Sequence, residues 1–564
     1  MLTESYYYDT RYPECKQTLC EMLEEIYLCD SGSHFTWVKP HIRMSHKELY
    51  EQSMAVAKGL LSLGLKRGDT VCSFGSQGPE SMFMLIACAS LGIKFCGTYL
   101  YAPVKKVLRT TITKVNPTAV LVGNSTSGNN QEHVFIEFCK VLEELAAEGL
   151  PKISHILYDS RVEGDDNCQI LDGWISLTGI ASSGPQSISN EILSKAKSIL
   201  SKDEPFLYLC SSGSTGEPKI VLTSSRLFTN ASNIARSRHN GVKKVSAISE
   251  VTEGDLRTII TAFRCLREKD DLVILHSSSS LNLDVVTDEI VSTIEKYRIE
   301  KVFLRSDYTA AIVNNKEFWQ KYDLSCLTSF SVAGNLWSSE FKKKMQQVAP
   351  HSRDIYGGTE FLGAIESRLF SQLPSNRFMS VGKPAYNVEV KIIDENGAIA
   401  PVNAKGELCI RGWPLFLEYK DQPELTAKVK DKEGWLHTGD MVSMDECGYI
   451  YVYGRMSNAQ RWKVASNVIY SISIETVLLK NPYIRSAVVL GTDNGHGHDI
   501  NYVIEPVPDS GLTVEDVTNY AKENMMSSLE WPVRVFFYTS MQLPMTSGSR
   551  PKGFANRYNT RNRQ

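Results

Sequence analysis

A chain of 564 residues is several times longer than one hydrophobic core requires, so it should fold as a large body with at least one further domain. Its 42% hydrophobic and 22% charged residues are ordinary for a globular protein and exclude extensive disorder. The 61 basic and 64 acidic residues leave a net charge of -3, which excludes a sequence-wide basic field, so nucleic acid is not an expected partner.

The first predicted elements alternate between helix and strand. Apolar residues recur at helical spacing from Ser45 to Leu65, and a strand is predicted at 70–74. A second helix, Pro79 to Leu91, leads to a strand from Lys94 to Thr98. The most apolar run, Met82 to Ile93, is too short to span a bilayer, so no transmembrane segment is expected. This alternation predicts a layered α/β domain with a largely parallel sheet.

The later part of the chain changes pattern twice. Between Asp159 and Ser201 the sequence is polar, which predicts long surface connections and one helix dividing the first α/β lobe from the next. Short alternating strands from Ser367 to Gly412 predict a β-rich lobe. We therefore expect a large domain, 1–455, of two α/β lobes plus the β-rich lobe, and a small α+β C-terminal domain, 456–564.

Cysteine and histidine spacing predicts neither disulfides nor structural zinc. The 13 cysteines contain no CxxC pair and suit reduced thiols. His496 and His498 lack a third spaced ligand, and the Asp165-Asp166 pair is interpreted as a solvated surface turn. The start lacks the apolar core of a signal peptide, so a cytoplasmic location is expected.

A loop of small residues follows a short apolar strand at Phe206 and ends in Lys219. Glycines let consecutive backbone N–H groups converge on an anion, and hydroxyls and the lysine add donors and positive charge, so the loop should bind phosphate. A P-loop would need Gly-Lys followed by a hydroxyl residue, whereas here Pro218 precedes the lysine and Ile220 follows it. The loop comprises Ser211, Ser212, Gly213, Ser214, Thr215, Gly216, Glu217 and Pro218.

Several segments, in the same order, resemble the adenylate-forming superfamily, which includes acyl-CoA synthetases and firefly-type luciferases. The segments are Ser211-Ser-Gly-Ser-Thr-Gly-Glu-Pro-Lys219, Tyr356-Gly-Gly-Thr-Glu360, Gly406-Glu-Leu-Cys-Ile-Arg-Gly412, Gly434-Trp-Leu-His-Thr-Gly-Asp440 and Gly454-Arg455. The resemblance implies an AMP-forming acid–thiol ligase with a mobile C-terminal domain. Its expected cofactors are ATP, Mg²⁺ and coenzyme A, and its substrate is a small-molecule carboxylic acid.

The resemblance also implies a role for each matched residue. Lys219 and the loop would hold phosphates, and Tyr356, beside Gly357, would stack on adenine. Thr359 would contact phosphate, and Glu360 would hold Mg²⁺. Asp440 would accept hydrogen bonds from the ribose, and Arg455 would lie beside it at the domain hinge, with Ser457 near the pivot. The acid pocket would include Gly334, Asn335, Phe361 and Leu362.

The last family motif, Leu-Pro-x-Thr-x-x-Gly-Lys, is altered here. The segment Leu543–Lys552 places Arg550 at the lysine position, and Lys552 reaches it only if the loop shifts. Arginine is not equivalent to a compact ammonium group. Val464-Ala465-Ser466 also replaces a glycine-containing turn. Two alternatives therefore stay open: a catalytically weak ATP- or acyl-binding protein, and an adenylating enzyme with an acceptor other than coenzyme A.

Overall fold

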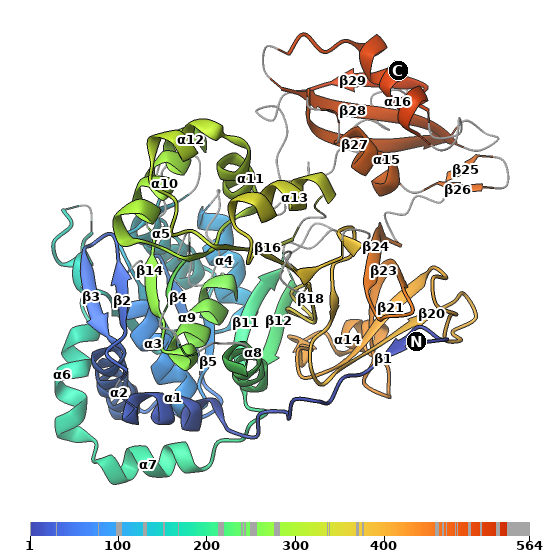
Figure 1. Ribbon diagram of the computed structural model, residues 1–564. Helices are drawn as coiled ribbons and strands as arrows, with labels where there is room; N and C mark the ends of the chain where they lie inside the picture. Colours follow the sequence, from blue (N-terminus) through green and yellow to red (C-terminus); the bar gives the residue numbers. More distant parts are fainter. Residues whose placement is uncertain are drawn as a thin grey trace.

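Figure 1 shows the computed structural model. It describes residues 2–538 except 30, 77, 98–103, 128–131, 150–152, 167, 212–218, 238–240, 242–243, 249–255, 276–282, 335–336, 338, 368–371, 375–376, 457–461, 465–466, 470, 480, 482, 494–497, 508–509 and 526–530. Two large sheets with their helices and a smaller antiparallel sheet precede residue 456, and a small α+β unit follows. The expected α/β architecture is confirmed, while the boundary at 455 stays a prediction.

The first large sheet is parallel from its first strand through β11. Its strands, in spatial order, are β10 (Ile175–Ser176), β9 (His155–Tyr158), β6 (Ala119–Val122), β4 (Thr70–Phe74), β5 (Lys94–Gly97), β11 (Pro205–Ser211), β12 (Lys219–Ser224) and β22 (Glu418–Tyr419). Four helices precede or connect the early strands of this sheet: α2 (His46–Ser62), α3 (Pro79–Leu91), α4 (Val104–Val115) and α5 (Val134–Ala147). The predicted helices and strands of this region are therefore present.

Local sequence explains where the first of these helices begin and end. Ser45 caps α2 together with Glu48, each side chain accepting a hydrogen bond from the other residue's backbone N–H. Pro79 opens α3, and Gly92 ends it with φ +65°, in the left-handed region that glycine tolerates.

The expectation for 159–201 is wrong in two respects. The segment holds two α-helices, α6 (Leu177–Ser187) and α7 (Asn190–Ser198), besides a short 3₁₀ helix, η1 (Ser160–Val162). It also adds β10 to the first sheet, which continues through β11 and β12, so it does not divide two lobes. A Cβ on Gly184 would lie 2.4 Å from the backbone nitrogen of Gly59, so its small residues let α6 pack closely on α2. The polar composition reflects exposed faces of these helices.

The second large sheet includes residues from near the N-terminus. Its order is β19 (Lys383–Pro384), β18 (Ile365–Glu366), β17 (Arg353–Tyr356), β16 (Ser329–Ala333), β15 (Lys301–Phe303), β13 (Val245–Ile248), β14 (Asp271–Ile274), β2 (His34–Trp37) and β3 (Ile42–Ser45). The helices in this part of the chain are α8 (Ser225–Ser237), which contacts β11 and β12 of the first sheet, α9 (Leu256–Glu268), α10 (Leu283–Tyr297), α11 (Ser306–Asn314), α12 (Lys316–Lys321) and α13 (Ser339–Val348). The hairpin β2–β3 therefore joins a sheet whose other strands lie 200 or more residues later.

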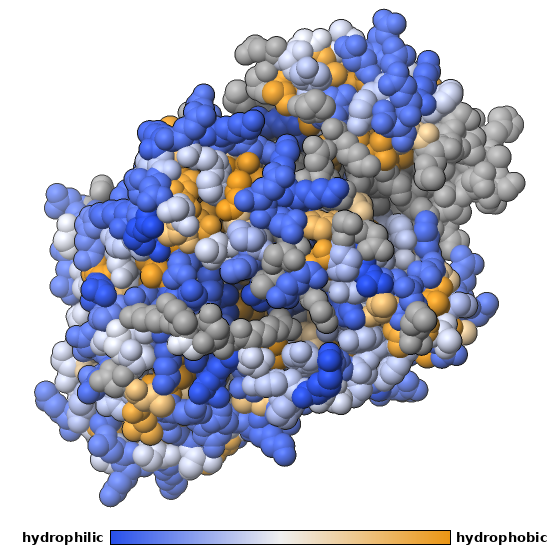
Figure 2. Space-filling model, in the orientation of Figure 1, coloured by the Kyte–Doolittle hydropathy of each residue, from blue (hydrophilic) through white to orange (hydrophobic). Residues whose placement is uncertain are grey.

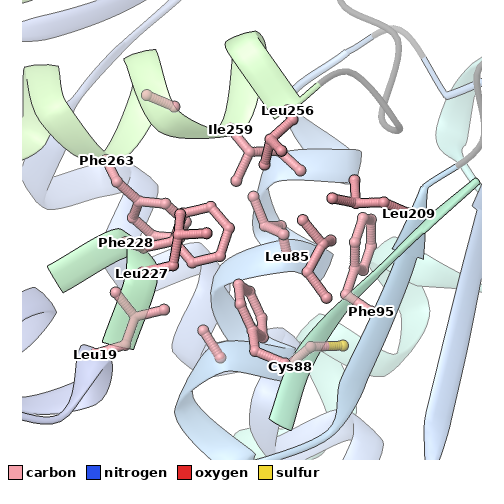
Figure 3. Packing of buried hydrophobic residues seen from close by; sticks show 14 of the residues in the cluster. Leu19, Leu85, Cys88, Phe95, Leu209, Leu227, Phe228, Leu256, Ile259 and Phe263 are labelled. Atoms are coloured by element: carbon pink, nitrogen blue, oxygen red, sulfur yellow. The ribbon is translucent and has the colours of Figure 1, made fainter. Parts of the chain in front are cut away.

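Aromatic side chains fill the space between the two large sheets. Phe228 on α8 packs edge-on against Phe206 of β11, with ring centroids 5.5 Å apart, and Phe263 of α9 lies 5.5 Å from Phe228. Figure 3 shows Phe228 and Phe263 near Leu85 and Phe95 of the first sheet's layer. One continuous core thus joins both α/β lobes.

The β-rich lobe is a five-stranded antiparallel sheet. It consists of β1 (Tyr6–Tyr7), β20 (Val388–Ile393), β21 (Gly406–Gly412), β23 (Leu436–Met444) and β24 (Ile450–Arg455), with α14 (Pro423–Val429) inserted. After β20 the carboxylate of Asp394 accepts hydrogen bonds from the backbone amides of Asn396 and Ala398, which forms a turn. The N-terminal segment crosses the molecule, because β1 pairs with β20 while α1 (Leu19–Leu28) packs near α8 and α9.

The C-terminal unit has its own core. Strands β27 (Ile484–Asp493), β28 (His498–Pro506) and β29 (Arg534–Phe537) form a sheet, and α15 (Ser471–Leu478) and α16 (Val514–Asn524) supply helices, beside the hairpin β25 (Trp462–Val464) and β26 (Asn467–Ile469). The α+β prediction is confirmed. Across the described ranges no helix combines the length and apolarity that crossing a membrane requires. The face in Figure 2 is mainly hydrophilic, with apolar residues in small groups.

Candidate active site

The predicted phosphate loop connects two antiparallel strands. Ser211 ends β11 and pairs with Lys219, the first residue of β12. A P-loop instead joins a strand to a helix, so the hairpin agrees with the sequence argument against one. The predicted contacts of Ser212, Gly213, Ser214, Thr215 and Gly216 lie outside the described residues.

Beside Lys219, a tyrosine hydroxyl holds the candidate metal ligand. Tyr419 of β22 donates a hydrogen bond to Oε1 of Glu360 over 2.8 Å. The Nζ atom of Lys219 lies 4.9 Å from the centroid of the Tyr419 ring, within cation–π range. Burial and the Glu360 carboxylate raise the pKa of Tyr419, so the phenol stays protonated at neutral pH and remains a donor.

A second group joins β17, β23 and β24. Tyr356 ends β17, and its hydroxyl donates a hydrogen bond to Oδ2 of Asp440. Arg455 pairs with Asp440 across β23 and β24, and its Nε lies 3.0 Å from Oδ1. Asp440 is only 6% exposed, and burial raises its pKa although Arg455 and the Tyr356 hydroxyl counteract that shift. The neighbouring cation and donor thus stabilise a carboxylate in a poorly solvated position.

Electrostatic effects show that the two groups share one region. The Glu360 carboxylate adds to the effect of burial that raises the pKa of Asp440, and the Arg455 cation partly offsets the rise in the pKa of Tyr419. β12 and β22 belong to the first large sheet, β17 to the second, and β23 and β24 to the β-rich lobe. The site therefore lies where three sheets meet, and the structure brings together five of the described candidate residues there: Lys219, Tyr356, Glu360, Asp440 and Arg455.

A tight turn carries the Tyr-Gly-Gly-Thr-Glu segment. A Cβ on Gly357 would lie 2.6 Å from the backbone nitrogen of Gly363, and one on Gly358 would lie 2.8 Å from the Phe361 ring. Side chains at both glycines would therefore clash, which explains the glycine pair. Thr359 lies in the same turn and is partly exposed.

The residues predicted to line the acid pocket differ in their surroundings. Phe361 is 2% exposed and its ring centroid lies 5.7 Å from that of Tyr356, so it packs beneath the tyrosine. Leu362 is partly buried against the main core, and Gly334 follows β16 with φ +83°. Their role as a pocket stays a prediction. Asn335, Arg550 and Lys552 lie outside the described residues.

Sequence reasoning missed Tyr419 and the function of Glu407. One oxygen of Glu407 accepts a hydrogen bond from the Gly439 amide over 3.0 Å, and the other lies 3.1 Å from Nδ1 of His437. Glu407 thus fixes the backbone directly ahead of Asp440. Glu407 lies in the Gly-Glu-Leu segment, so the sequence pattern did contain a signal for it. No spacing in the sequence links residues 419 and 360.

The fold and the site together define an adenylating enzyme of the AMP-forming acid–CoA ligase type. The chain belongs to the family described as AMP-binding enzyme, whose model matches residues 30–420. The earlier resemblance to adenylate-forming enzymes is thereby confirmed.

Among its relatives are the mitochondrial medium-chain acyl-CoA ligase ACSF2 of Bos taurus, with 24% identity over 90% of this chain and 82% of that protein. A 4-coumarate–CoA ligase of Vanilla planifolia is 27% identical over 78% of this chain and 74% of that protein. The crystal structure of the anthranilate CoA ligase AuaEII with anthranoyl-AMP shows the same fold, with a TM-score of 0.76, 18% identity and 97% of each chain covered.

Proposed function

We propose that this enzyme converts a carboxylic acid to an acyl-adenylate with ATP and transfers the acyl group to coenzyme A. The proposal rests on two neighbouring groups of side chains. One consists of Tyr356, Asp440 and Arg455. The other consists of Lys219, Tyr419 and Glu360. Fatty acids of medium length are the first substrates to test, since relatives aligned along 90% of the chain are named medium-chain acyl-CoA ligases. A cytoplasmic location stays a prediction.

The electrostatic problem of this reaction explains the residues. In adenylation a carboxylate oxygen attacks the α-phosphorus, a P–O bond forms, and the α–β anhydride bond breaks with its electrons leaving on pyrophosphate. Two anions must therefore approach each other, which fixed cations and donors make possible. Lys219, beside Tyr419, and Arg455, beside Asp440, supply positive charge to the described site.

The chemistry of Glu360 fits a magnesium ligand. Tyr419 holds Oε1, while Oε2 makes no hydrogen bond or ion pair with the residues whose positions the structure gives. A carboxylate oxygen is the ligand type that Mg²⁺ prefers, and the ion would neutralise phosphate charge when bound. Tyr419 orients the carboxylate for this role.

Asp440 can bind ribose while keeping its protein partners. Each carboxylate oxygen has two acceptor positions, so hydrogen bonds from Tyr356 and Arg455 leave acceptor capacity for hydroxyl groups. Arg455 also donates from Nη1 to the carbonyl of Thr438 over 2.6 Å, which anchors the guanidinium beside Asp440. In the transfer step the thiol sulfur of coenzyme A would attack the acyl carbonyl, AMP would leave, and the thiol proton would pass to solvent.

ATP–pyrophosphate exchange tests the proposal on the full chain, over a panel of fatty and aromatic acids with and without coenzyme A. We expect acid-dependent exchange and thioester formation. Exchange without thioester would favour an acceptor other than coenzyme A, as the altered 464–466 segment allows. ATP binding without exchange would contradict the proposal and favour a catalytically weak homologue. Arg550→Ala should abolish exchange and Lys552→Ala should not; the reverse would refute the alignment of Arg550 with the family lysine.

A further inference from the structure

A second group of chemically reactive side chains lies outside the nucleotide site. His133, Asp165 and Cys168 each offer one ligand atom, and these atoms all lie within 4.8 Å of one another. The histidine and the other two residues come from segments more than 30 positions apart. Spacing in the sequence could not bring them together.

Regular local structure holds the three residues in place. The short hairpin of β7 (Thr126–Ser127) and β8 (Glu132–His133) ends at His133, directly before α5. After η1, the Asp165 amide donates to the carbonyl of Val162 over 3.3 Å, and the Cys168 amide donates to the carbonyl of Asp165 over 2.9 Å. These consecutive turns place Asp165 and Cys168 together beside the start of α5.

Side-chain contacts orient the aspartate. Nε2 of His133 lies 3.2 Å from Oδ2 of Asp165, and the side-chain amide of Asn124 donates a hydrogen bond to the same oxygen over 3.1 Å. The Asn124 amide also donates to the carbonyl of Arg161 over 3.3 Å, so it is itself fixed. Asp165 is 18% exposed and His133 14% exposed, so both are held yet accessible to an ion from solvent. Of the Asp165-Asp166 pair, Asp166 is exposed in a turn as expected, whereas Asp165 is partly buried and has side-chain partners.

We propose that His133, Asp165 and Cys168 bind a zinc ion, with water as the fourth ligand. Imidazole nitrogen, carboxylate oxygen and thiolate sulfur are the ligands of tetrahedral zinc, at about 2.0–2.3 Å. In a tetrahedral site with these bond lengths, the ligand atoms lie about 3.4 Å from one another. The three side chains must therefore shift by about 1 Å to bind the ion. Asn124 then orients a ligating carboxylate. The ion links the start of α5 to the 165–168 turn.

Binding at this site involves no redox change. The S–H bond of Cys168 breaks, its electron pair forms the Zn–S bond, and the proton passes to solvent.

A second group, Glu407, Cys409 and His437, also meets the distance condition. Its atoms already have roles in the nucleotide site, since Glu407 holds the Gly439 amide and His437. Cys409 is fully buried, and its Sγ lies 3.6 Å from Nδ1 of His437. A substitution in this group therefore serves as a control for substitutions in the proposed zinc site.

Cobalt substitution tests the zinc site in the purified full chain. After removal of metal with a chelator, Co²⁺ is titrated without nucleotide, and the thiolate-to-cobalt absorption band is recorded. Wild type and Cys409→Ser should show the band with about one ion per chain, and Cys168→Ser should lose it. Zinc affinity, measured by competition with a coloured indicator, should fall at least about tenfold in Asp165→Asn and about tenfold in Asn124→Ala.

Three results would overturn the zinc site: no band in wild type, a band that survives in Cys168→Ser, or loss of the band in Cys409→Ser alone. Circular dichroism confirms that each variant folds, and Asp165→Asn keeps the shape of the side chain should Cys168→Ser prove unstable. Added zinc should also raise the Tm of wild type and leave that of Cys168→Ser unchanged.

Discussion

The Tyr419 hydroxyl donates a 2.8 Å hydrogen bond to Oε1 of Glu360, which connects an edge strand of the first large sheet to the turn that follows β17 in the second. The same tyrosine ring faces the Lys219 ammonium group. One side chain thus positions both a candidate metal ligand and a candidate phosphate ligand.

Tyr419→Phe should lower acid-dependent exchange about 10-fold and raise the Mg²⁺ concentration needed for half-maximal rate. The change removes a hydrogen bond to a charged group, about 1.5–3 kcal/mol, and keeps the ring beneath Lys219. Tyr322→Phe is the matched control, because Tyr322 makes a similar 2.8 Å bond to Asp288, away from the site. Equal rates in both variants would show that Tyr419 does not position Glu360.

Asp440→Asn should weaken ATP binding at least about 10-fold, since it removes the carboxylate that Tyr356 and Arg455 orient. Isothermal titration calorimetry with ATP measures this loss of affinity. Asp445→Asn is the control, because Asp445, directly after β23, is another buried carboxylate paired with an arginine, Arg377, at 2.9 Å. It should lower stability and leave ATP affinity unchanged. An Asp440→Asn protein that binds ATP normally would contradict the assignment.

Gly184→Ala should destabilise the protein by about 1–3 kcal/mol, because the added Cβ would meet the α2 backbone at 2.4 Å. Gly179→Ala lies on the same helix, where a Cβ would be no closer than 3.4 Å to a neighbouring side chain. This control should be neutral or slightly stabilising. Urea unfolding compares the two, and equal midpoints would argue against close packing of α6 on α2.

Stability should depend on Glu25 in acid. Hydrogen bonds from Arg267, followed by Gln17, lower the pKa of Glu25 from 4.5 to about 2. Since the pKa in the folded protein is depressed, the stabilisation is complete above about pH 4.5 and disappears as pH falls toward 2. Glu25→Gln should therefore lower the urea midpoint at pH 7.

The effect of Glu25→Gln should stay below about 1 kcal/mol, since the side chain is 38% exposed and solvent screens the pair. The difference from wild type should shrink at pH 3. Glu424→Gln, on the exposed face of α14, supplies the control and should shift neither midpoint. A difference for Glu25→Gln that persists unchanged at pH 3 would contradict the pKa argument.

Local sequence determined much of the secondary structure. The Ser45 cap, the Pro79 start and the Asp394 turn each depend on residues within a few positions, so their elements could be predicted with near-correct bounds. The residues of the candidate nucleotide site could be proposed from the sequence, because their types and order resemble those of a family whose chemistry needs them. Only tertiary structure showed that Tyr356 and Asp440 meet through a direct hydrogen bond.

Long-range pairing was beyond prediction from the sequence. The strand β1 pairs with β20, Tyr419 meets Glu360, and His133 meets Asp165, and none of these pairs shares a spacing that a periodic pattern could reveal. Local propensity and hydrophobic period act over a few residues, whereas these contacts form when separate sheets pack on one core. The sequence thus determined the elements and the chemistry of this enzyme, and packing decided which side chains work together.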